Sequence, residues 1–551
     1  MLCCVWLAGS ASADLAQRID GIIGHNSQKN VEYSVHVVKA DTGKTLYGYN
    51  AKTALVPASN MKIITTSAAL KYLGPKHVFT TTAGLCGDTL VVIGDGDPLL
   101  GDRAVDEKDG KQPGWIFADI VKALKENGIT AIKDLVVDST VFDDERVHPN
   151  WPKEQLNCWY ACEVSGVNYN DNCVQISSRT AGSNVELLVD PPTGFIEITN
   201  KMQVIPAGGA TIGSYRGTQP NCITVVGKCK DTAGPVDVAI ERPAAFFGYL
   251  LAEALVAGGI KTQGQLIGKP VDRNCSLKTL RQYSHSLTDC LARCNKDSLG
   301  LAAESLLKTI AAKTSKTGKN GSWQRGRAAV TAFLDELGIE QSEFFIDDGS
   351  GLSRQNELSA NAITTVLVWV HKSEAWPTYR DSFAVGGVDG TIHKYFTDAK
   401  YKGKILGKTG YIGGVKSFSG VCLCRDGDYI FSILTNGANG HTREAINGIA
   451  KAQTSNIVSA AGPDRTVVLQ RDSVIITAGN SHYQGGDERI CERRLLTGAA
   501  QAQRAIGISA RGPDGAGYRQ RARPAVLRAA VVVRRVVPFR MEIVEPAARR
   551  P

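Results

Sequence analysis

The chain has 551 residues, a length that indicates about three to four domains. Its hydrophobic content of 43% and charged content of 21% are typical of a globular protein with a sizeable core. The net charge of +9 lies almost entirely in residues 452–551, which hold 16 Arg, no Lys and 8 acidic residues. Because the rest of the chain is close to neutral, its charge gives little support to a nucleic-acid partner.

The N-terminus has the pattern of an export signal. Residues 2–9 form a short apolar run, and Ala11-Ser12-Ala13 before Asp14 fits a small-residue cleavage site. The run is too short to span a bilayer, and no later run is long enough. We therefore expect a signal peptide over residues 1–13 and export to the periplasm or cell envelope, which leaves open a peripheral membrane association.

The first half of the chain is rich in strand patterns. Residues 31–49 alternate in polarity around a turn, which predicts a β-hairpin. An apolar helix then begins near Ser59 and stops at Gly74. Residues 79–275 hold many short β-like runs between Gly, Asn and Pro turns, and we interpret them as a β-rich insertion.

Helix patterns dominate the second half until strands return. Helices are predicted over residues 244–257, 287–308, 325–337 and 441–453, and strands over 403–410, 415–424 and 429–435. This order predicts one α/β domain interrupted by an insertion. Its segments are 14–80 (first part), 81–275 (insertion) and 276–455 (second part), followed by an Arg-rich tail, 456–551, that we expect to be mostly disordered.

Fourteen cysteines are more typical of an exported chain than of a cytosolic one. Cys158 and Cys173 flank one compact segment, and Cys222 and Cys229 flank a shorter one, so we predict a disulfide within each pair. Two Cys-x3-Cys spacings lack a second ligand pair at zinc-finger spacing, and no phosphate loop or dinucleotide fingerprint occurs. The sequence therefore predicts no metal site and no cofactor.

Ser59 and Lys62 form the most informative motif. They lie one helical turn apart at an abrupt loop-to-helix junction, so a hydroxyl and an amine can reach the same reacting atom. A lysine can then activate a serine without a histidine. The second Ser-x-x-Lys motif, Ser305 to Lys308, lies within an ordinary core stripe, and we predict a structural role for it.

Lys408-Thr409-Gly410 supplies a second element on a predicted strand. The lysine and the threonine offer a cation and a hydroxyl to a substrate carboxylate, and Gly410 lets a substrate backbone approach closely. An edge strand can also pair with an extended peptide. The same triplet at residues 316–318 lies in a Lys- and Gly-rich stretch that we interpret as a solvated loop.

Together these motifs resemble the class C low-molecular-mass penicillin-binding proteins, the D-alanyl-D-alanine carboxypeptidase/endopeptidases of peptidase family S13. The matching segments, in chain order, are Ser59-x-x-Lys62, residues 94–98 (GDGDP), 137–142 (VDSTVF), 347–354 (DDGSGLSR), 388–391 (VDGT) and Lys408-Thr409-Gly410. The resemblance covers about residues 31–453. It implies a serine transpeptidase-like (β-lactamase-like) α/β domain with a five-stranded sheet, and two inserted β-rich domains, one nested in the other.

The resemblance implies a serine-type D-Ala-D-Ala carboxypeptidase, with endopeptidase activity left open. Ser59 would attack the carbonyl of the penultimate D-Ala, with Lys62 as general base. The N–H groups of Ser59 and Tyr411 would hold the oxyanion, and Ser298 would protonate the leaving D-Ala. The substrate would be a peptidoglycan stem peptide ending in D-Ala-D-Ala, and β-lactams would be inhibitors.

The resemblance also implies residues that bind the substrate. Lys408, Thr409 and Gly410 would hold its terminal carboxylate, and the charge of Lys408 would favour the neutral form of Lys62. Asp138 matches an acidic residue that would receive the free amine of a diamino-acid stem side chain; the alternative is an ordinary turn residue.

The pattern departs from the family at Gly300, where the Ser-x-Asn motif that starts at Ser298 should end in asparagine. Losing that amide costs about 1 to 3 kcal/mol, or roughly 10- to 100-fold in rate. Asn295 or a water could substitute. Two alternative hypotheses stay open, namely a penicillin-binding pseudoenzyme that recognises stem peptides, and a related esterase or β-lactamase with the same nucleophile.

Overall fold

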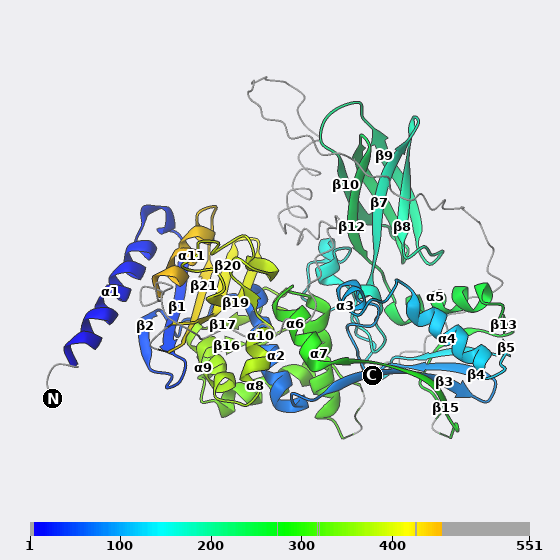
Figure 1. Ribbon diagram of the computed structural model, residues 1–551, viewed down its shortest axis with the longest axis horizontal. Coiled ribbons are helices and arrows are strands. Elements are labelled where there is room, and N and C mark those ends of the chain that lie inside the picture. Colours follow the sequence, from blue (N-terminus) through cyan, green and yellow to red (C-terminus); the bar gives the residue numbers. More distant parts are fainter. Residues whose placement is uncertain (1–4, 273, 317, 319, 425–426, 454–551) are drawn as a thin grey trace.

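The computed structural model describes residues 5–453 except 273, 317, 319, 425 and 426 (Figure 1). The predicted disordered tail, residues 456–551, lies outside the described residues. Helix α1 (Val5–Ile23) continues past the predicted cleavage point, and its Leu15, Ile19 and Ile23 are buried. Within the described residues, no helix combines the length and apolarity that a membrane span needs.

A six-stranded sheet forms the core of the first domain. In sheet order its strands are β18 (Ala384–Val385), β19 (Ile405–Ile412), β20 (Val415–Cys422), β21 (Tyr429–Asn436), β1 (Glu32–Lys39) and β2 (Thr45–Tyr49). All neighbours are antiparallel, and Ile412 pairs with Val415 at the predicted hairpin turn. The expected five strands are joined by a sixth, the two-residue β18. The sheet thus unites segments from both ends of the described chain.

Alternate side chains of this sheet face two different cores. Phe431 and Ile433 pack with α1 and α11 (Thr442–Ala452), whereas Ile430 and Leu434 pack with the helices of the opposite face. Those helices are α2 (Met61–Leu73), α6 (Leu287–Asn295), α7 (Gly300–Lys313), α8 (Trp323–Glu336), α9 (Ala360–His371) and α10 (Trp376–Asp381). The helix predicted over residues 287–308 is therefore two helices, because Ser298 has a left-handed φ of 68°.

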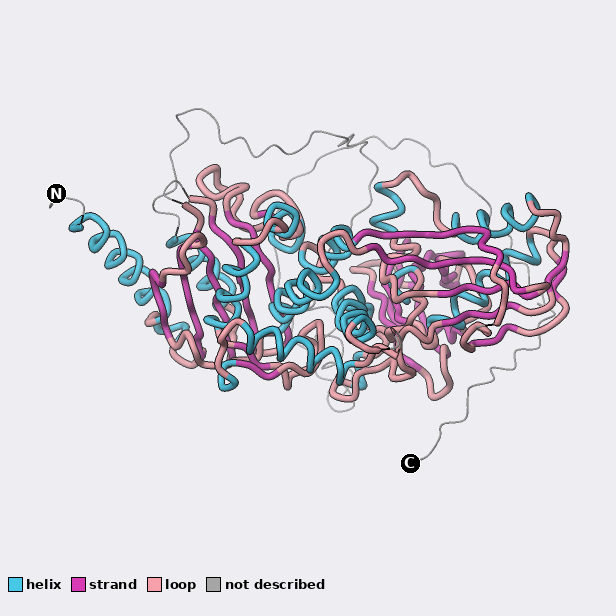
Figure 2. The backbone as a smooth tube through the Cα atoms, turned by 90° about the horizontal axis from the view of Figure 1, so that it is seen from below, coloured by secondary structure: helices cyan, strands magenta, loops and turns pink. Residues whose placement is uncertain are grey.

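The chain leaves this domain through β3 (Val78–Cys86) and returns through the antiparallel β15 (Lys278–Ser286). Both belong to a five-stranded sheet in the order β14-β6-β4-β3-β15, with β4 (Thr89–Ile93), β6 (Leu135–Asp138) and β14 (Leu266–Gly268). Helices α4 (Trp115–Glu126) and α5 (Pro243–Ala257) pack against this sheet in a core separate from that of the first domain. A short helix, α3 (Arg103–Lys108), lies between β4 and α4 in the chain. Figure 2 shows the two large sheets at opposite ends of the molecule, with helices between them.

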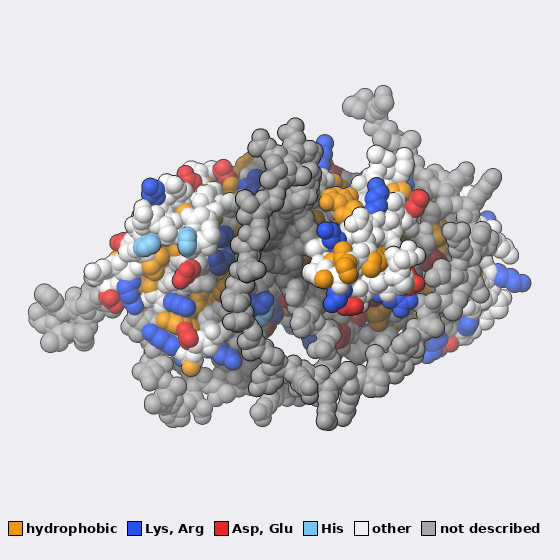
Figure 3. All heavy atoms as spheres, turned by 90° about the horizontal axis from the view of Figure 1, so that it is seen from above, with side chains coloured by type: hydrophobic (Ala, Val, Ile, Leu, Met, Phe, Trp, Pro, Cys, Tyr) orange, Lys and Arg blue, Asp and Glu red, His pale blue; other side chains and the backbone are white. Residues whose placement is uncertain are grey.

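A further β module lies between β6 and α5 in the sequence. It consists of two three-stranded sheets, β10-β11-β9 and β12-β7-β8. The strands are β7 (Cys173–Ala181), β8 (Asn184–Asp190), β9 (Glu197–Val204), β10 (Thr211–Arg216), β11 (Cys222–Cys229) and β12 (Thr232–Ala239). Two short pairs, β5 (Ala131–Ile132) with β13 (Lys261–Thr262) and β16 (Phe344–Phe345) with β17 (Glu357–Leu358), lie elsewhere. Acidic and basic side chains are intermingled on the described surface in Figure 3.

The cysteine pairing differs from the prediction. Cys173, Cys222 and Cys229 are thiols, so both predicted disulfides are wrong. Cys222 and Cys229 occupy opposite ends of β11, about 23 Å apart in an extended strand.

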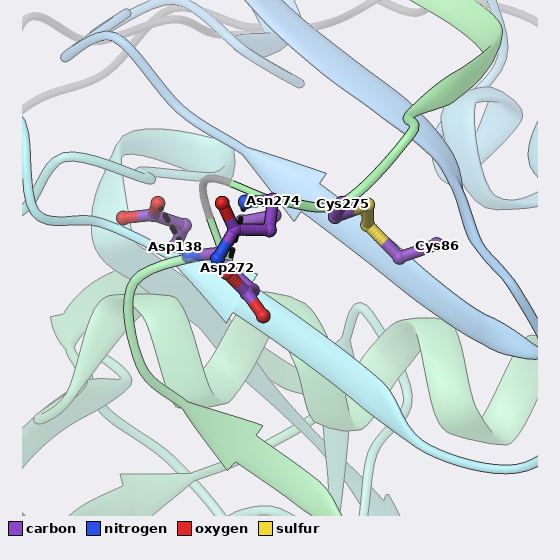
Figure 4. The surroundings of a disulfide bond; sticks show 6 residues. Cys86, Asp138, Asp272, Asn274 and Cys275 are labelled. Atoms are coloured by element: carbon purple, nitrogen blue, oxygen red, sulfur yellow. Dashed lines mark hydrogen bonds between the residues drawn. A yellow bond between two sulfur atoms is a disulfide. The ribbon is translucent and has the colours of Figure 1, made fainter.

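Strand β12 separates the other predicted pair. Cys158 pairs with its Val238, and Cys173 pairs with Ala239 from the other side. Two strand spacings, about 10 Å, exceed the reach of a disulfide. The observed disulfide joins Cys86 to Cys275, 189 residues apart, next to the β3–β15 pair (Figure 4). It connects the two ends of the insertion.

Candidate active site

Ser59 lies in a 3-10 turn, Ala58–Asn60, that leads directly into α2. Ala58 has a left-handed φ of 48°, which is unusual for a residue with a Cβ atom. Gly351, with a φ of 82°, packs so closely that a Cβ atom there would lie 1.9 Å from the Ala58 carbonyl oxygen. The neighbouring loop, residues 347–356, therefore packs against the Ala58–Asn60 turn at a point that only glycine permits.

The side chain of Asn60 binds the Ala58–Asn60 turn to the sheet. Its Nδ2 donates to the Lys408 carbonyl at 2.8 Å, and its Oδ1 accepts from the Ser419 hydroxyl at 2.5 Å. The Ser417 hydroxyl donates to the Pro57 carbonyl at 2.7 Å. The turn is thus fixed against both β19 and β20.

Lys62 lies on the first turn of α2 and is only 3% exposed. Its Nζ is 3.1 Å from Ser59 Oγ and donates to the Ser350 carbonyl at 2.8 Å. A buried amine at this distance can take the Ser59 proton. The predicted nucleophile and base are therefore within hydrogen-bonding distance.

Lys408 is fully buried in β19 and reaches the turn between α6 and α7. Its Nζ donates to the Ser298 hydroxyl at 2.8 Å and to the Thr409 carbonyl at 2.7 Å. Burial raises the pKa of the Cys294 thiol to about 11, and the charges of Lys62 and Lys408 oppose that rise. Both lysine amines thus lie near the Cys294 thiol. The structure therefore brings two predicted pairs together, Ser59 with Lys62 and Ser298 with Lys408.

Gly410 has a packing reason to be glycine. A Cβ atom there would lie 2.1 Å from Ser417 Oγ and 3.0 Å from the backbone nitrogen of Ser59. Strand β19 therefore passes directly beside the Ser59 N–H, and Tyr411 follows on the same strand. The Arg443 guanidinium donates to the Gly410 carbonyl at 3.2 Å and supports this strand from α11.

A hydroxyl pair lies at the same edge of the site. Thr409 Oγ1 donates to Thr391 Oγ1 at 2.9 Å, and Thr391 is exposed. The Thr391 N–H donates to the Lys296 carbonyl at 3.2 Å, and the Lys296 amine pairs with Asp389 at 2.7 Å. Residues 389–391 thereby connect Thr409 to the turn that carries Ser298. The VDGT segment was noticed in the sequence, but Thr391 was not predicted as a site residue.

Asp138 forms its observed contacts within the insertion. It is 3% exposed; Oδ1 accepts from the Thr140 N–H and hydroxyl at 2.9 and 2.6 Å, and Oδ2 accepts from the Val271 N–H at 2.9 Å. Figure 4 shows Asp138 beside the segment with Asp272 that leads to Cys275. The bond to Thr140 is that of an Asx-turn, which favours the turn role. Amine binding by Asp138 stays a prediction.

The start of α7 explains how the chain accommodates Gly300. A Cβ atom at Gly300 would lie 2.8 Å from the Tyr160 carbonyl oxygen, so backbone fills the space where a side chain would begin. Asn295 is fully buried, and its Nδ2 donates to Ser382 Oγ at 2.9 Å. The amide nitrogen that could have replaced the missing group is therefore engaged elsewhere.

The fold and this cluster, in which a buried lysine lies beside the Ser59 hydroxyl, are those of a serine hydrolase. The family model for the D-Ala-D-Ala carboxypeptidase 3 (S13) family matches residues 15–456, and the chain belongs to that family of serine peptidases.

Known proteins support this assignment. The D-alanyl-D-alanine carboxypeptidase of Actinomadura sp. (strain R39) is 28% identical over 484 residues, covering 83% of this chain and 87% of the relative. The D-alanyl-D-alanine carboxypeptidase DacB of Haemophilus influenzae is 26% identical over 411 residues, covering 71% of this chain and 82% of its own. The crystal structure of penicillin binding protein 4 from Haemophilus influenzae has the same fold, with a TM-score of 0.66 at 23% identity over 80% of this chain and 98% of that one.

Proposed function

We propose that this protein hydrolyses peptides ending in D-Ala-D-Ala through an acyl-enzyme on Ser59. The observation that carries the proposal is the cluster of two serines and two lysines from three separate segments. Lys62 Nζ lies 3.1 Å from Ser59 Oγ, and Lys408 Nζ lies 2.8 Å from Ser298 Oγ. Each hydroxyl thus has its own amine.

In the proposed reaction, Ser59 Oγ attacks the carbonyl carbon of the penultimate D-Ala while neutral Lys62 takes its proton. The oxyanion forms beside the Ser59 N–H, where β19 passes closest, with the Tyr411 N–H as the second donor. Ser298 gives a proton to the departing amine as the C–N bond breaks, and the Lys408 amine restores that proton. Water then attacks the ester carbonyl, and its proton passes through Ser298 to the neutral Lys408 amine. Protonated Lys62 returns its proton to Ser59 Oγ as the ester bond breaks, which releases the shortened peptide and restores both amines.

The terminal carboxylate of the substrate binds at Thr409 and Thr391 in this proposal. Because Lys408 is buried, its charge acts on the carboxylate through the Ser298 hydroxyl, to which its amine donates. Thr409 donates to Thr391, so the Thr391 proton is free to point to the substrate. We infer export to the periplasm or cell envelope from the N-terminal pattern and the peptidoglycan substrate.

The penicillin-binding pseudoenzyme is the second candidate, because Gly300 lacks the amide that family members use. A related esterase or β-lactamase is the third.

Release of D-Ala from a synthetic D-Ala-D-Ala peptide distinguishes them. We expect release by the wild type, none by Ser59→Ala, and normal release by Ser305→Ala, which changes the serine of the second motif. Binding of the peptide without release would support the pseudoenzyme. Rapid turnover of an ester or β-lactam without D-Ala release would support the third candidate. A cross-linked stem dimer tests the endopeptidase reaction.

A further inference from the structure

Glu304 is a buried carboxylate on α7 that receives three N–H donors. It is 1% exposed; Oε1 accepts from the Ser350 N–H at 2.7 Å, and Oε2 accepts from the Gly349 N–H at 2.9 Å and from Trp323 Nε1 at 2.7 Å. Two successive backbone groups of one loop are thus held by one side chain of a helix. Such charge-assisted bonds are stronger and better oriented than neutral ones.

The same loop residue holds the predicted base. Glu304 accepts from the Ser350 N–H at 2.7 Å, and the Ser350 carbonyl accepts from Lys62 Nζ at 2.8 Å. Glu304 and Lys62 therefore bind the two backbone groups of the same residue. Asp348 fixes the following backbone, since its carboxylate accepts from the Gly351 and Ser353 N–H groups, each at 2.7 Å. The loop cannot shift toward the Ala58–Asn60 turn, because Gly351 already lies against the Ala58 carbonyl.

We propose that Glu304 is a positioning residue that fixes the Ser350 carbonyl as the acceptor of Lys62, in place of orientation by an amide at residue 300. This inference rests on the proposed function. It bears on this chain because Gly300 has no side chain and the Tyr160 carbonyl occupies the adjoining space. The base is then oriented by a backbone carbonyl that a buried carboxylate holds.

The electrostatic surroundings fit this role. Burial, followed by the charge of Asp348, raises the pKa of Glu304 to about 7. The bonds from Ser350, Trp323 and Gly349 oppose that rise, as expected for donors that favour the carboxylate form. The Glu304 charge also acts on the pKa of Lys308 on the same helix, where it opposes the lowering caused by burial. Loss of the carboxylate would therefore remove the acceptors that organise residues 349 and 350.

The test compares two buried carboxylates, each changed to an amide. Glu343 is a matched control because it is also 1% exposed, but it binds Ser359 and Asn361 at the start of α9, outside the loop. The non-covalent dissociation constant and the acylation rate for a fluorescent penicillin are measured separately. We expect Glu304→Gln to lower the acylation rate about 10- to 100-fold, with the dissociation constant changed less than about 2-fold. Glu343→Gln should leave both within about 2-fold.

Lys62 itself gives a readout that does not depend on catalysis. In protein with 13C-labelled lysine, the Lys62 Cε signal, assigned with a Lys62→Arg variant, should move in Glu304→Gln and stay in Glu343→Gln. Failure of the wild type to label would refute the proposed function, whereas an unmoved Lys62 signal would refute the positioning role. Equal acylation losses in both variants would also refute it. If Glu304→Gln does not fold, Trp323→Phe removes one bond to Glu304 and should give the same pattern at about 3-fold; no effect would overturn the proposal.

Discussion

The Lys408 amine lies 2.8 Å from the Ser298 hydroxyl, and this contact joins β19 to the turn between α6 and α7. Ser298 has a φ of 68°, a conformation that a free chain rarely adopts. The ion pair between Lys296 and Asp389, 2.7 Å long, braces the same turn. The surrounding structure therefore holds the hydroxyl in a strained position where it can act on a leaving group.

Ser298→Ala should slow D-Ala release by about 100- to 10,000-fold, because the leaving amine loses its proton donor. The thermal midpoint should change little. Ser305→Ala is the control, since the buried Ser305 hydroxyl has no hydrogen-bond partner among the described residues. Release by Ser298→Ala at the wild-type rate would remove Ser298 from the mechanism.

Gly300→Asn should not restore a faster enzyme. The new side chain would meet the Tyr160 backbone carbonyl, so we expect a loss of about 1 to 3 kcal/mol in the free energy of unfolding and no gain in acylation rate. Gly440→Asn is the control, because nothing lies within 4 Å of a Cβ atom there. A stable and faster Gly300→Asn enzyme would contradict the packing explanation.

Thr391→Val should weaken binding of substrates that carry a free carboxylate. We expect KM for a D-Ala-D-Ala peptide to rise about 10- to 150-fold, as for the loss of one hydrogen bond to a charged group. The C-terminal amide of the same peptide should be affected less than about 2-fold, and the exposed Thr397→Val should affect neither. An equal effect of Thr391→Val on both peptides would show that the hydroxyl does not recognise the carboxylate.

Asp95 should make stability depend on pH. Burial raises its pKa to about 7; Oδ2 accepts from the Thr80 N–H at 2.7 Å, and Oδ1 is buried without a partner among the described residues. The folded state therefore retains a proton that the unfolded state loses, so this contribution to stability falls as pH rises from about 4 to about 7. Asp95→Asn should be more stable than the wild type by about 1 to 3 kcal/mol at pH 8.

Denaturant unfolding at two pH values checks this. The advantage of Asp95→Asn should largely vanish near pH 4, where the folded-state carboxyl is protonated and the unfolded-state carboxyl is about half protonated. An equal advantage at both pH values would point to a packing effect instead.

The site residues that could be predicted from the sequence are those that form short, recognisable motifs, and these motifs lie together in the structure. Ser59 and Lys62 share a helix turn, and Lys408 lies on the predicted strand, so short-range patterns were sufficient to find them. Ser298 was found through the family resemblance, although its left-handed turn divides a segment that we predicted as one helix. Side-chain periodicity does not record such a turn.

Long-range contacts could not be predicted. Cys86 and Cys275 are 189 residues apart, and their pairing depends on how β3 and β15 come together. Glu304 lies in the predicted helix over residues 287–308, and no sequence pattern connects it with its partners Gly349 and Ser350 in a distant loop. In the sequence, Gly300 indicated only the loss of an asparagine side chain. The Tyr160 carbonyl that fills the adjoining space comes from the insertion, which the sequence pattern does not place there.

The most direct test of the central claim is to label the full chain with a fluorescent penicillin and map the adduct by peptide mass spectrometry. Ser59→Ala and Ser305→Ala serve as the paired controls, with folding checked by circular dichroism. We predict one stable adduct on Ser59, absent in Ser59→Ala and retained in Ser305→Ala. A folded wild-type protein without an adduct, or with the adduct on another residue, would contradict the assignment of Ser59 and Lys62 as nucleophile and base.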